Sequence, residues 1–512
     1  MDEATFYRNL GFSSNPFQYT NADEEEKLPQ YFIPPPYFQS VMGDPDKPSS
    51  CVVFAPRGGG KSAQRKMIEI TSKNSGVLPI QYSRFEFEKG QSLNDCDLEY
   101  HLMNINRICL IALLMAIHER CLDHMNFESA ERAQIQGLCK YYLHDLNSDN
   151  IRNAVNAITS PFEKAKEFFD RNLWSINSIM ESIFSKIGIK PIQEKSSLTG
   201  SIVKPSKNHL EFLIALIRTV GFRSIYILVD KVDETHITGN DSEASFELIK
   251  PVIRDLELLQ MNGLAFKFFL WNELYPFYNK YARPDRIPQF NLEWTPVELK
   301  EMMGNRLRAH SSPEKELDFY DILAVSDDSK NLIQDLVITF SHGSPRDMIR
   351  ICQQMVTEQL RSGLERHGIS ALGVSNGFNV FCEHRAREVV PDHLLDELRK
   401  TRRLDFTVNY VANEVFKIGA NGARSKINTW LKTGTVKHID DIQLEKSKRP
   451  SHHYAVIDSR LAKSILSDVD FLDFIMKKVR FCPKCSSPVL RDWDISQTHR
   501  CQKCKNRWTS TE

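Results

Sequence analysis

The chain has 512 residues, enough for three or four folding units of roughly 150 residues each. Its hydrophobic fraction of 41% and charged fraction of 26% exclude a wholly disordered or collagen-like chain. The longest apolar run, 108–117, is about half the length that spans a bilayer, and MDEATFYRNL at the N-terminus lacks the pattern of a secretion signal. We expect a cytoplasmic protein with no membrane partner, whose 11 cysteines are thiols or metal ligands rather than disulfides.

The net charge is zero, but its distribution along the chain is uneven. Residues 401–512 carry 21 Lys and Arg against 12 Asp and Glu, a surplus of nine positive charges, and the first 400 residues carry the matching deficit. A polyanion, if one binds, is therefore expected to contact the C-terminal region. The alternative is a solvated basic face without a partner.

The first 45 residues are rich in proline, aromatic residues and acids. The run Pro34–Pro36 cannot lie inside a regular helix, so this segment predicts an extended arm whose rings pack on a core. Beyond it, short β-branched runs alternate with helical patterns, which predicts an α/β fold with a parallel sheet covered on both faces. The predicted strands are 51–54, 77–87, 224–229 and 264–271, with helices at 62–72 and 209–220 and a linker at 196–208.

A phosphate-binding loop is predicted at 55–62, APRGGGKS, because it follows a strand and opens a helix. Glycines let backbone N–H groups close around the β-phosphate of ATP, and the helix N-terminus adds partial positive charge. Lys61 is expected to reach the β- and γ-phosphates, and the Ser62 hydroxyl to ligate Mg²⁺. The loop residues assigned to ATP are Gly58, Gly59, Gly60, Lys61 and Ser62.

Polar residues follow the next predicted strands. Asp230 ends the strand SIYILV, at the edge where open α/β sheets bind ligands, and we assign it to Mg²⁺. Asp233 and Glu234 lie three and four residues further on, and either could also merely cap the following helix. Asn272 ends the strand at 264–271 and is expected to orient water against the γ-phosphate, although asparagine is common at strand ends.

Three arginines are candidates for contacting the phosphates. Arg283 and Arg286 precede a last strand and could act as an arginine finger in a neighbouring subunit; the alternative is a pair of ordinary surface arginines. Arg346, in the sequence GSPR at 343–346, opens a helix and is expected to point toward the γ-phosphate from a helical lid.

The chain resembles AAA+ and STAND-type P-loop ATPases in four features: the loop, LVDKVDE at 228–234, Asn272 and GSPR. The order of its predicted domains, a lid followed by a winged helix, resembles that of origin-recognition-type initiators. The segments NPF, YFIPPPYF and VVFAPRGGGKSA further resemble poorly characterised bacterial P-loop ATPases, some encoded near phage-defence genes. The resemblance covers residues 10–95 and 208–470. It implies hydrolysis of ATP to ADP and phosphate, a homo-oligomer and a role in antiviral defence. In AAA+ ATPases the catalytic Glu usually follows the Asp directly; Lys231 stands there, which leaves Glu234, or else Asp233, to activate water.

A winged helix is predicted at 391–475. Helices at 406–418 and 424–432 precede a hairpin formed by 435–439 and 453–457 around a basic turn at 446–450. The second helix carries Arg424, Lys426, Asn428, Trp430 and Lys432, which suit contacts with nucleic acid. Winged helices also dock proteins, so both partners stay open.

Two CxxC pairs near the C-terminus, Cys482/Cys485 and Cys501/Cys504, have the spacing of a Cys₄ zinc ribbon. About thirty residues bury too little apolar surface to fold alone, so Zn²⁺ would supply the missing stability. A redox pair is the alternative. The remaining seven cysteines, including Cys51, Cys109 and Cys352, are expected in the core.

The resulting hypothesis is an ATP-hydrolysing AAA+/STAND-like switch that binds DNA or RNA through its C-terminal modules. The alternative is a nucleotide-stabilised scaffold with little hydrolysis that docks a protein effector, which Lys231 favours. The expected division is an N-terminal arm (1–45), a P-loop ATPase core in two parts (46–96 and 208–310), a helical insertion (97–207), a helical lid (311–390), a winged helix (391–475) and a zinc ribbon (478–512).

Overall fold

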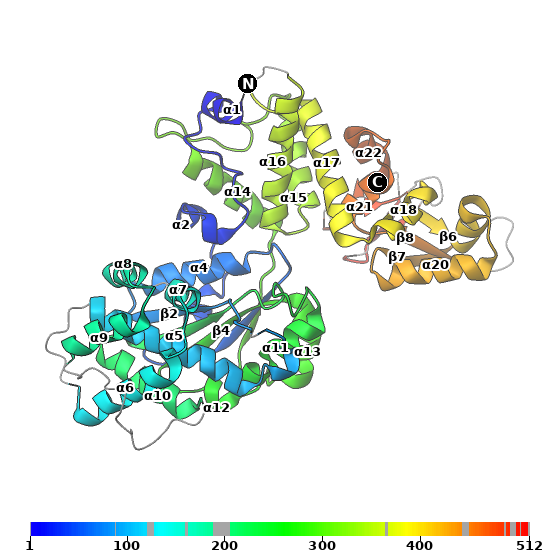
Figure 1. Ribbon diagram of the computed structural model, residues 1–512. Helices are drawn as coiled ribbons and strands as arrows, with labels where there is room; N and C mark the ends of the chain where they lie inside the picture. The colour runs from blue at the N-terminus through cyan, green and yellow to red at the C-terminus, as the bar shows by residue number, and fades with distance from the viewer. Residues whose placement is uncertain are drawn as a thin grey trace. The chain divides into compact units, whose positions relative to one another are not determined.

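The computed structural model describes residues 2–509 except 88, 120–126, 159–161, 188–204, 364–366, 443–449, 486–487, 492–497 and 502. Most of the predicted linker and of the basic turn therefore lies outside the described residues. The chain forms two compact units, which we call the sheet unit (22–293) and the C-terminal unit (1–21 with 294–512). Figure 1 shows the elements of both along the chain.

The sheet unit is built on five strands in the order β2-β3-β4-β1-β5, and all neighbouring strands are parallel. This confirms the α/β class, with the phosphate loop between the first strand and the first long helix, as in P-loop NTPases. The strands are β1 (Cys51–Ala55), β2 (Val77–Tyr82), β3 (Ser224–Val229), β4 (Leu264–Trp271) and β5 (Gln289–Asn291).

The strand predicted to reach residue 87 ends at Tyr82, because its partner strand ends there too. Tyr82 pairs with Val229, the last residue of β3, and β2 has no other neighbour in the sheet. Polar and aromatic residues alternate along 83–87, as in a strand. No backbone hydrogen-bond ladder with a neighbouring strand continues past Tyr82, so these residues form no strand.

The sheet is covered by helices, and its three inner strands, β3, β4 and β1, are buried almost throughout, as a parallel sheet requires. Alternate residues of β1–β4 join one large core with helices that follow β2 and β3. The helices of the sheet unit are α2 (Leu28–Tyr31), α3 (Phe38–Met42), α4 (Lys61–Ser72), α5 (Leu98–Glu119), α6 (Ser129–Leu143), α7 (Ser148–Ala157), α8 (Glu163–Arg171), α9 (Ile176–Lys186), α10 (Lys207–Thr219), α11 (Ser242–Ile253), α12 (Leu256–Leu259) and α13 (Tyr275–Tyr281), with short 3₁₀ turns at η1 (Ala22–Glu24), η2 (Leu93–Asp95) and η3 (Asn272–Leu274).

Helix α5 is the central helix of the segment between β2 and β3. By length and composition it is the one helix among the described residues that could span a membrane, yet 78% of that stretch is buried inside the protein. His101 joins it to the sheet: its ring nitrogens lie 2.8 Å from the Tyr82 hydroxyl and 2.7 Å from the Leu248 carbonyl oxygen. Burial lowers the pKa of His101 to about 4, so this side chain is neutral at pH 7.

In the C-terminal unit, the segment of residues 2–21 contacts α14 (Pro296–His310) and the residue that follows it. Phe12 forms an isolated antiparallel bridge with Ser311, and the buried Arg306 guanidinium donates to the carbonyl oxygens of Pro16 and Tyr19. The prediction of an extended arm is wrong for residues 3–10, which form helix α1 (Glu3–Leu10). The Asp2 carboxylate caps the start of this helix, and Gly11 ends it. The arm also divides at residue 21 between the two units. No helix crosses Pro34–Pro36.

The rest of this unit is helical up to residue 401 and then mixed. Figure 1 shows α15, α16 and α17 beside one another. The helices are α14 (Pro296–His310), α15 (Asp327–Phe340), α16 (Pro345–Arg361), α17 (Ala371–Val389), α18 (Asp392–Thr401), α19 (Val408–Tyr410), the π-helical turn η4 (Val411–Phe416), α20 (Ala420–Lys432), α21 (Ser459–Ile465) and α22 (Phe471–Lys478). The strands are β6 (Asp405–Thr407), β7 (Val436–Ile442), β8 (Ser451–Val456), β9 (Val479–Phe481), β10 (Pro488–Leu490), β11 (Thr498–Arg500) and β12 (Arg507–Thr509).

In the segment predicted as a winged helix, the described residues form an antiparallel sheet β6-β8-β7, and α20 contacts β7. Two expectations are wrong here. First, the segment 406–418 is not one helix. It begins in strand β6 and continues through the short helix α19 into the π-helical turn η4. Trp430 is fully buried, with its ring 5.6 Å from that of Phe406, so it belongs to the core and is not placed to contact a ligand.

Candidate functional site

The loop between β1 and α4 has the backbone of a phosphate cradle. Gly58 and Gly60 adopt φ values of 75° and 100°, which other residues rarely adopt. A Cβ on Gly59 would lie 2.9 Å from the Pro56 carbonyl oxygen, so the loop also requires glycine there. The Lys61 ammonium donates to the carbonyl oxygens of Ala55 and Pro56, both at 3.2 Å, which holds this charge at the loop.

Ser62 and Asp230 meet at the carboxyl edge of the sheet. The Ser62 hydroxyl donates to Asp230 Oδ2 at 2.9 Å, although 168 residues separate them. Asp230 is 1% exposed, and its Oδ1 accepts from the backbone N–H of Lys231 at 2.9 Å. A hydroxyl and a carboxylate oxygen beside a phosphate loop are the hard ligands that Mg²⁺ prefers.

Arg65 joins this pair to two more carboxylates. Its side chain is 1% exposed; Nε donates to Asp230 Oδ2 at 3.1 Å, and the two terminal nitrogens donate to Glu69 and Asp23. We call these four residues the Arg65 cluster. Burial raises the pKa of Glu69, whereas the three carboxylates together raise the pKa of Arg65 against the effect of burial. One guanidinium thus contacts carboxylates from three separate segments of the chain.

Lys231 occupies the position after Asp230 and points to the Arg65 cluster. Its Nζ lies 2.9 Å from Asp23 Oδ2, and its backbone has a φ of 59°, in the left-handed region that lysine seldom adopts. Burial opposes it, but Arg65 and Lys231 together lower the pKa of Asp23. The lysine therefore has a carboxylate partner from the segment before the sheet.

The two candidate bases have different surroundings. Asp233 is 6% exposed and accepts from Arg57 Nε and Nη2 of the phosphate loop, at 3.0 and 2.8 Å. The same guanidinium lies 4.1 Å from the centre of the Trp271 ring. Glu234 is exposed, and no hydrogen bond or ion pair of its carboxylate occurs among the described residues. Glu234 is thus the less constrained of the two.

Asn272 is exposed and begins the turn η3 directly after β4. Because β4 lies between β1 and β3, this position falls between the phosphate loop and Asp230 at the same edge of the sheet.

The three candidate arginines lie in two places. Arg283 and Arg286 are about half exposed, and their guanidinium nitrogens lie 2.8 and 3.8 Å from the Asp285 carboxylate. Arg346 is exposed in the first turn of α16, in the C-terminal unit.

The four C-terminal cysteines converge. Sulfur atoms of Cys482 and Cys504 lie 3.5 Å apart, and those of Cys485 and Cys501 lie 3.6 Å apart. A tetrahedral metal with bonds of about 2.3 Å requires sulfur separations of about 3.8 Å. Around them, only Val489 and Trp508 complete a small apolar cluster among the described residues.

The other described cysteines are buried, as expected for core residues, and burial raises the pKa of Cys109 to about 12.

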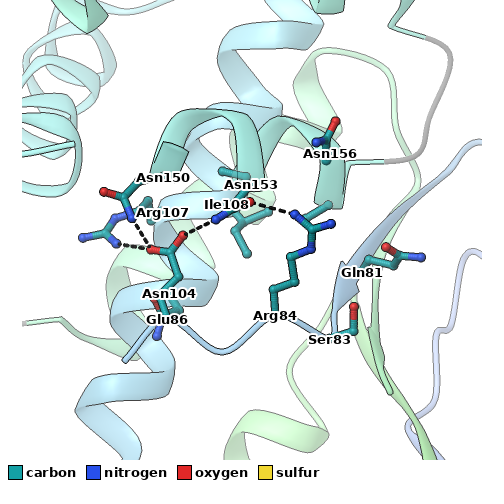
Figure 2. Close-up of a pocket in the computed structure, with 12 residues that line it drawn as sticks. Gln81, Ser83, Arg84, Glu86, Asn104, Arg107, Ile108, Asn150, Asn153 and Asn156 are labelled. Carbon is teal, nitrogen blue, oxygen red and sulfur yellow. Dashed lines mark hydrogen bonds and ion pairs between the residues drawn. The ribbon is translucent and has the colours of Figure 1, made fainter. Parts of the chain in front are cut away.

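A polar pocket of about 60 Å³ opens beyond the carboxyl end of β2 (Figure 2). Asn150 and Arg107 direct N–H groups at the Glu86 carboxylate, at 3.0 and 3.4 Å, so the protein's own anion satisfies these donors. Gln81 also lines the pocket and donates to Glu69 of the Arg65 cluster at 3.1 Å. The lining residues are Gln81, Ser83, Arg84, Glu86, Asn104, Arg107, Ile108, Asn150, Asn153, Ala154, Asn156 and Ala157.

Sequence reasoning missed Arg65, Asp23 and Arg57. The spacing of Arg65 and Glu69, four residues apart on one helix, was a readable signal for an ion pair. Arg57 lies within the phosphate loop itself, yet a local pattern does not reveal its partner Asp233, 176 residues away. Nothing in ADEEEK marked Asp23 as a partner of the loop helix.

No protein-family model and no curated protein sequence matches this chain. Among solved structures it is similar to the Aeropyrum pernix Orc1 protein in complex with DNA, at 10% sequence identity and a TM-score of 0.39. The match covers 88% of this chain and 97% of that one.

Proposed function

We propose that this protein binds and hydrolyses ATP as a cytoplasmic, homo-oligomeric molecular switch of the AAA+/STAND kind. The observation that carries the proposal is the 2.9 Å hydrogen bond between Ser62 of the loop helix and Asp230 at the end of β3. It joins the two residues that P-loop NTPases use for the metal of the nucleotide. A part in defence against phage is the biological role that the resemblance of residues 10–95 favours.

In this proposal Ser62 and Asp230 hold Mg²⁺, which neutralises charge on the phosphates when the nucleotide is bound. The loop N–H groups and Lys61 bind the β- and γ-phosphates. Glu234, whose carboxylate is exposed, takes the proton of the attacking water, and Asn272 orients that water. Arg283 or Arg286 from a neighbouring subunit, and Arg346 from the lid, stabilise the charge that develops on the transferred phosphoryl group.

Two substitutions separate binding from turnover. Lys61→Ala should weaken ATP binding by at least roughly a hundredfold, because it removes a charged donor to phosphate. Glu234→Gln should leave ATP binding intact but lower turnover by roughly 10²- to 10⁴-fold, because a base acts only on the attacking water. Isothermal titration with ATP and a phosphate-release assay measure the two effects.

Asp233→Asn is the matched comparison, since Asp233 is the neighbouring carboxylate but is paired with Arg57. If Asp233→Asn abolishes turnover while Glu234→Gln leaves it unchanged, Asp233 is the base and the assignment of Glu234 is wrong. Unchanged ATP binding by Lys61→Ala would contradict the proposed nucleotide site itself.

We further propose that the C-terminal modules bind DNA or RNA, supported by the surplus of nine positive charges in residues 401–512. On α20, Arg424 is exposed and donates only to the neutral Asn421 side chain among the described contacts. Lys426 is half-buried and lies 2.5 Å from the Glu397 carboxylate. Arg424 is therefore better placed than Lys426 to contact phosphate.

Nucleic-acid binding by the full chain should weaken steeply as salt rises, because each neutralised phosphate releases counterions. Arg424→Ala should reduce affinity about equally across sequences, and Lys426→Ala should reduce it less, because its charge already has a partner. Mobility shifts at two salt concentrations, with the exposed Lys164→Ala as control, measure these differences. The absence of any shift at low salt would remove support for this partner.

The second candidate function is a nucleotide-stabilised scaffold that docks a protein effector and hydrolyses little ATP. Lys231 favours it, since a lysine paired with Asp23 stands where AAA+ ATPases usually place the catalytic Glu. ATP binding without measurable turnover, and without salt-dependent binding of DNA or RNA, is the result that this candidate requires.

A further inference from the structure

The hairpin of β7 and β8 brings three metal-ligating side chains to one face. Asp441 lies directly across from His452 in the strand register. His438 precedes a register shift: it pairs with Tyr454, whereas Asp440 pairs with His453, so Ile439 is an extra residue on β7. In a regular strand, residues 438 and 441 would point to opposite faces. The bulge turns them to the same one.

The three side chains converge on one point. Asp441 Oδ1 lies 2.9 Å from His438 Nε2 and 2.6 Å from His452 Nδ1, and the ligand atoms of all three residues lie within 4.8 Å of one another. All three are exposed, so an ion reaches them directly from solvent. We call these residues the hairpin triad.

We propose that the hairpin triad is a binding site for a divalent first-row transition metal, separate from the four C-terminal cysteines. Two imidazoles and one carboxylate form a ligand set of borderline softness, which suits Zn²⁺ and its neighbours and leaves positions for water. A bound ion would replace the two hydrogen bonds to Asp441 and link the two strands. The site does not depend on the proposed ATPase activity.

The test is a titration of the full chain with Zn²⁺ after the cysteine site has been filled. We expect one further equivalent of Zn²⁺ to bind, measured by competition with a chromophoric zinc indicator. His438→Ala, His452→Ala and Asp441→Asn should each weaken this second equivalent by at least roughly tenfold. His393→Ala is the matched control, because it removes an exposed histidine on α18, outside the hairpin.

Substitution of Co²⁺ for Zn²⁺ assigns each equivalent to its site. The second equivalent should lack thiolate-to-metal charge-transfer absorption and should persist when Cys482 and Cys485 are replaced by Ser. Because the triad side chains are exposed, the far-UV circular dichroism of the three variants should match that of the parent chain. Binding of no second equivalent would overturn the proposal, as would equal loss in His393→Ala or full retention in the three triad variants.

Discussion

Replacing Arg65 with alanine should lower the free energy of unfolding of the sheet unit by about 3–5 kcal/mol. The guanidinium is 1% exposed and is the shared partner of Asp230, Glu69 and Asp23. Its removal would leave the buried Asp230 and Glu69 carboxylates without their main counter-charge, and a cavity beside them. Equilibrium unfolding in urea, followed by circular dichroism, measures the loss.

Arg223→Ala supplies the control, because Arg223 is 45% exposed and pairs with a single exposed carboxylate, Asp46. An exposed pair of this kind contributes under about 1 kcal/mol. Arg65→Lys should recover only part of the loss, since one ammonium cannot reproduce three directed contacts. Equal stability of Arg65→Ala and Arg223→Ala would show that the Arg65 cluster does not hold the loop helix to the sheet.

Replacing Cys482 and Cys485 with serine should remove about one zinc per chain and unfold residues 478–512. The cluster around these cysteines contains only Val489 and Trp508 besides the sulfur ligands, among the described residues. So small an apolar core cannot offset the entropy of ordering the segment, whereas a structural zinc site supplies roughly 10–16 kcal/mol. Elemental analysis and limited proteolysis measure the two losses.

Cys96→Ala is the matched control for zinc content, since Cys96 is a buried cysteine outside the group. It should leave the metal content unchanged, and ATP binding by the serine variant should remain, because the nucleotide site lies in the other unit. A metal-free chain whose C-terminal segment resists protease would contradict the assignment of a structural zinc site.

The positions of the loop 55–62 and of Asp230 in the fold could be predicted from sequence, because both follow strands whose patterns are local. β3 and β4 have the predicted bounds, and parallel strands align their carboxyl ends. Apart from the local pair of Arg65 with Glu69, the Arg65 cluster could not be located, because its other contacts join residues 42 and 165 positions apart. Local periodicity contains no information about which segments meet.

The segment predicted as a winged helix shows a different limit of sequence-based prediction. The sequence predicts that this helix begins at residue 424, yet α20 begins at Ala420 and includes Gly422, because its buried residues Ala423, Ile427 and Trp430 fix one face against the core. Packing thus outweighs the helix cost of about 1 kcal/mol for an interior glycine. The same packing explains why Trp430 is absent from the exposed face that was predicted to contact nucleic acid.

The attachment of residues 1–21 to α14 has a consequence for synthesis on the ribosome. The contact between Pro16 and Arg306 spans 290 residues, and the whole sheet unit lies between them in the chain. At roughly 5–20 residues per second, about 15–60 s pass between translation of the first segment and of its partner. Throughout that delay the side chains of Phe6, Tyr7 and Phe17, all buried in the finished protein, lack the later-translated residues of the C-terminal unit. During synthesis residues 6–17 are thus a segment with exposed aromatic side chains, to which a chaperone is expected to bind.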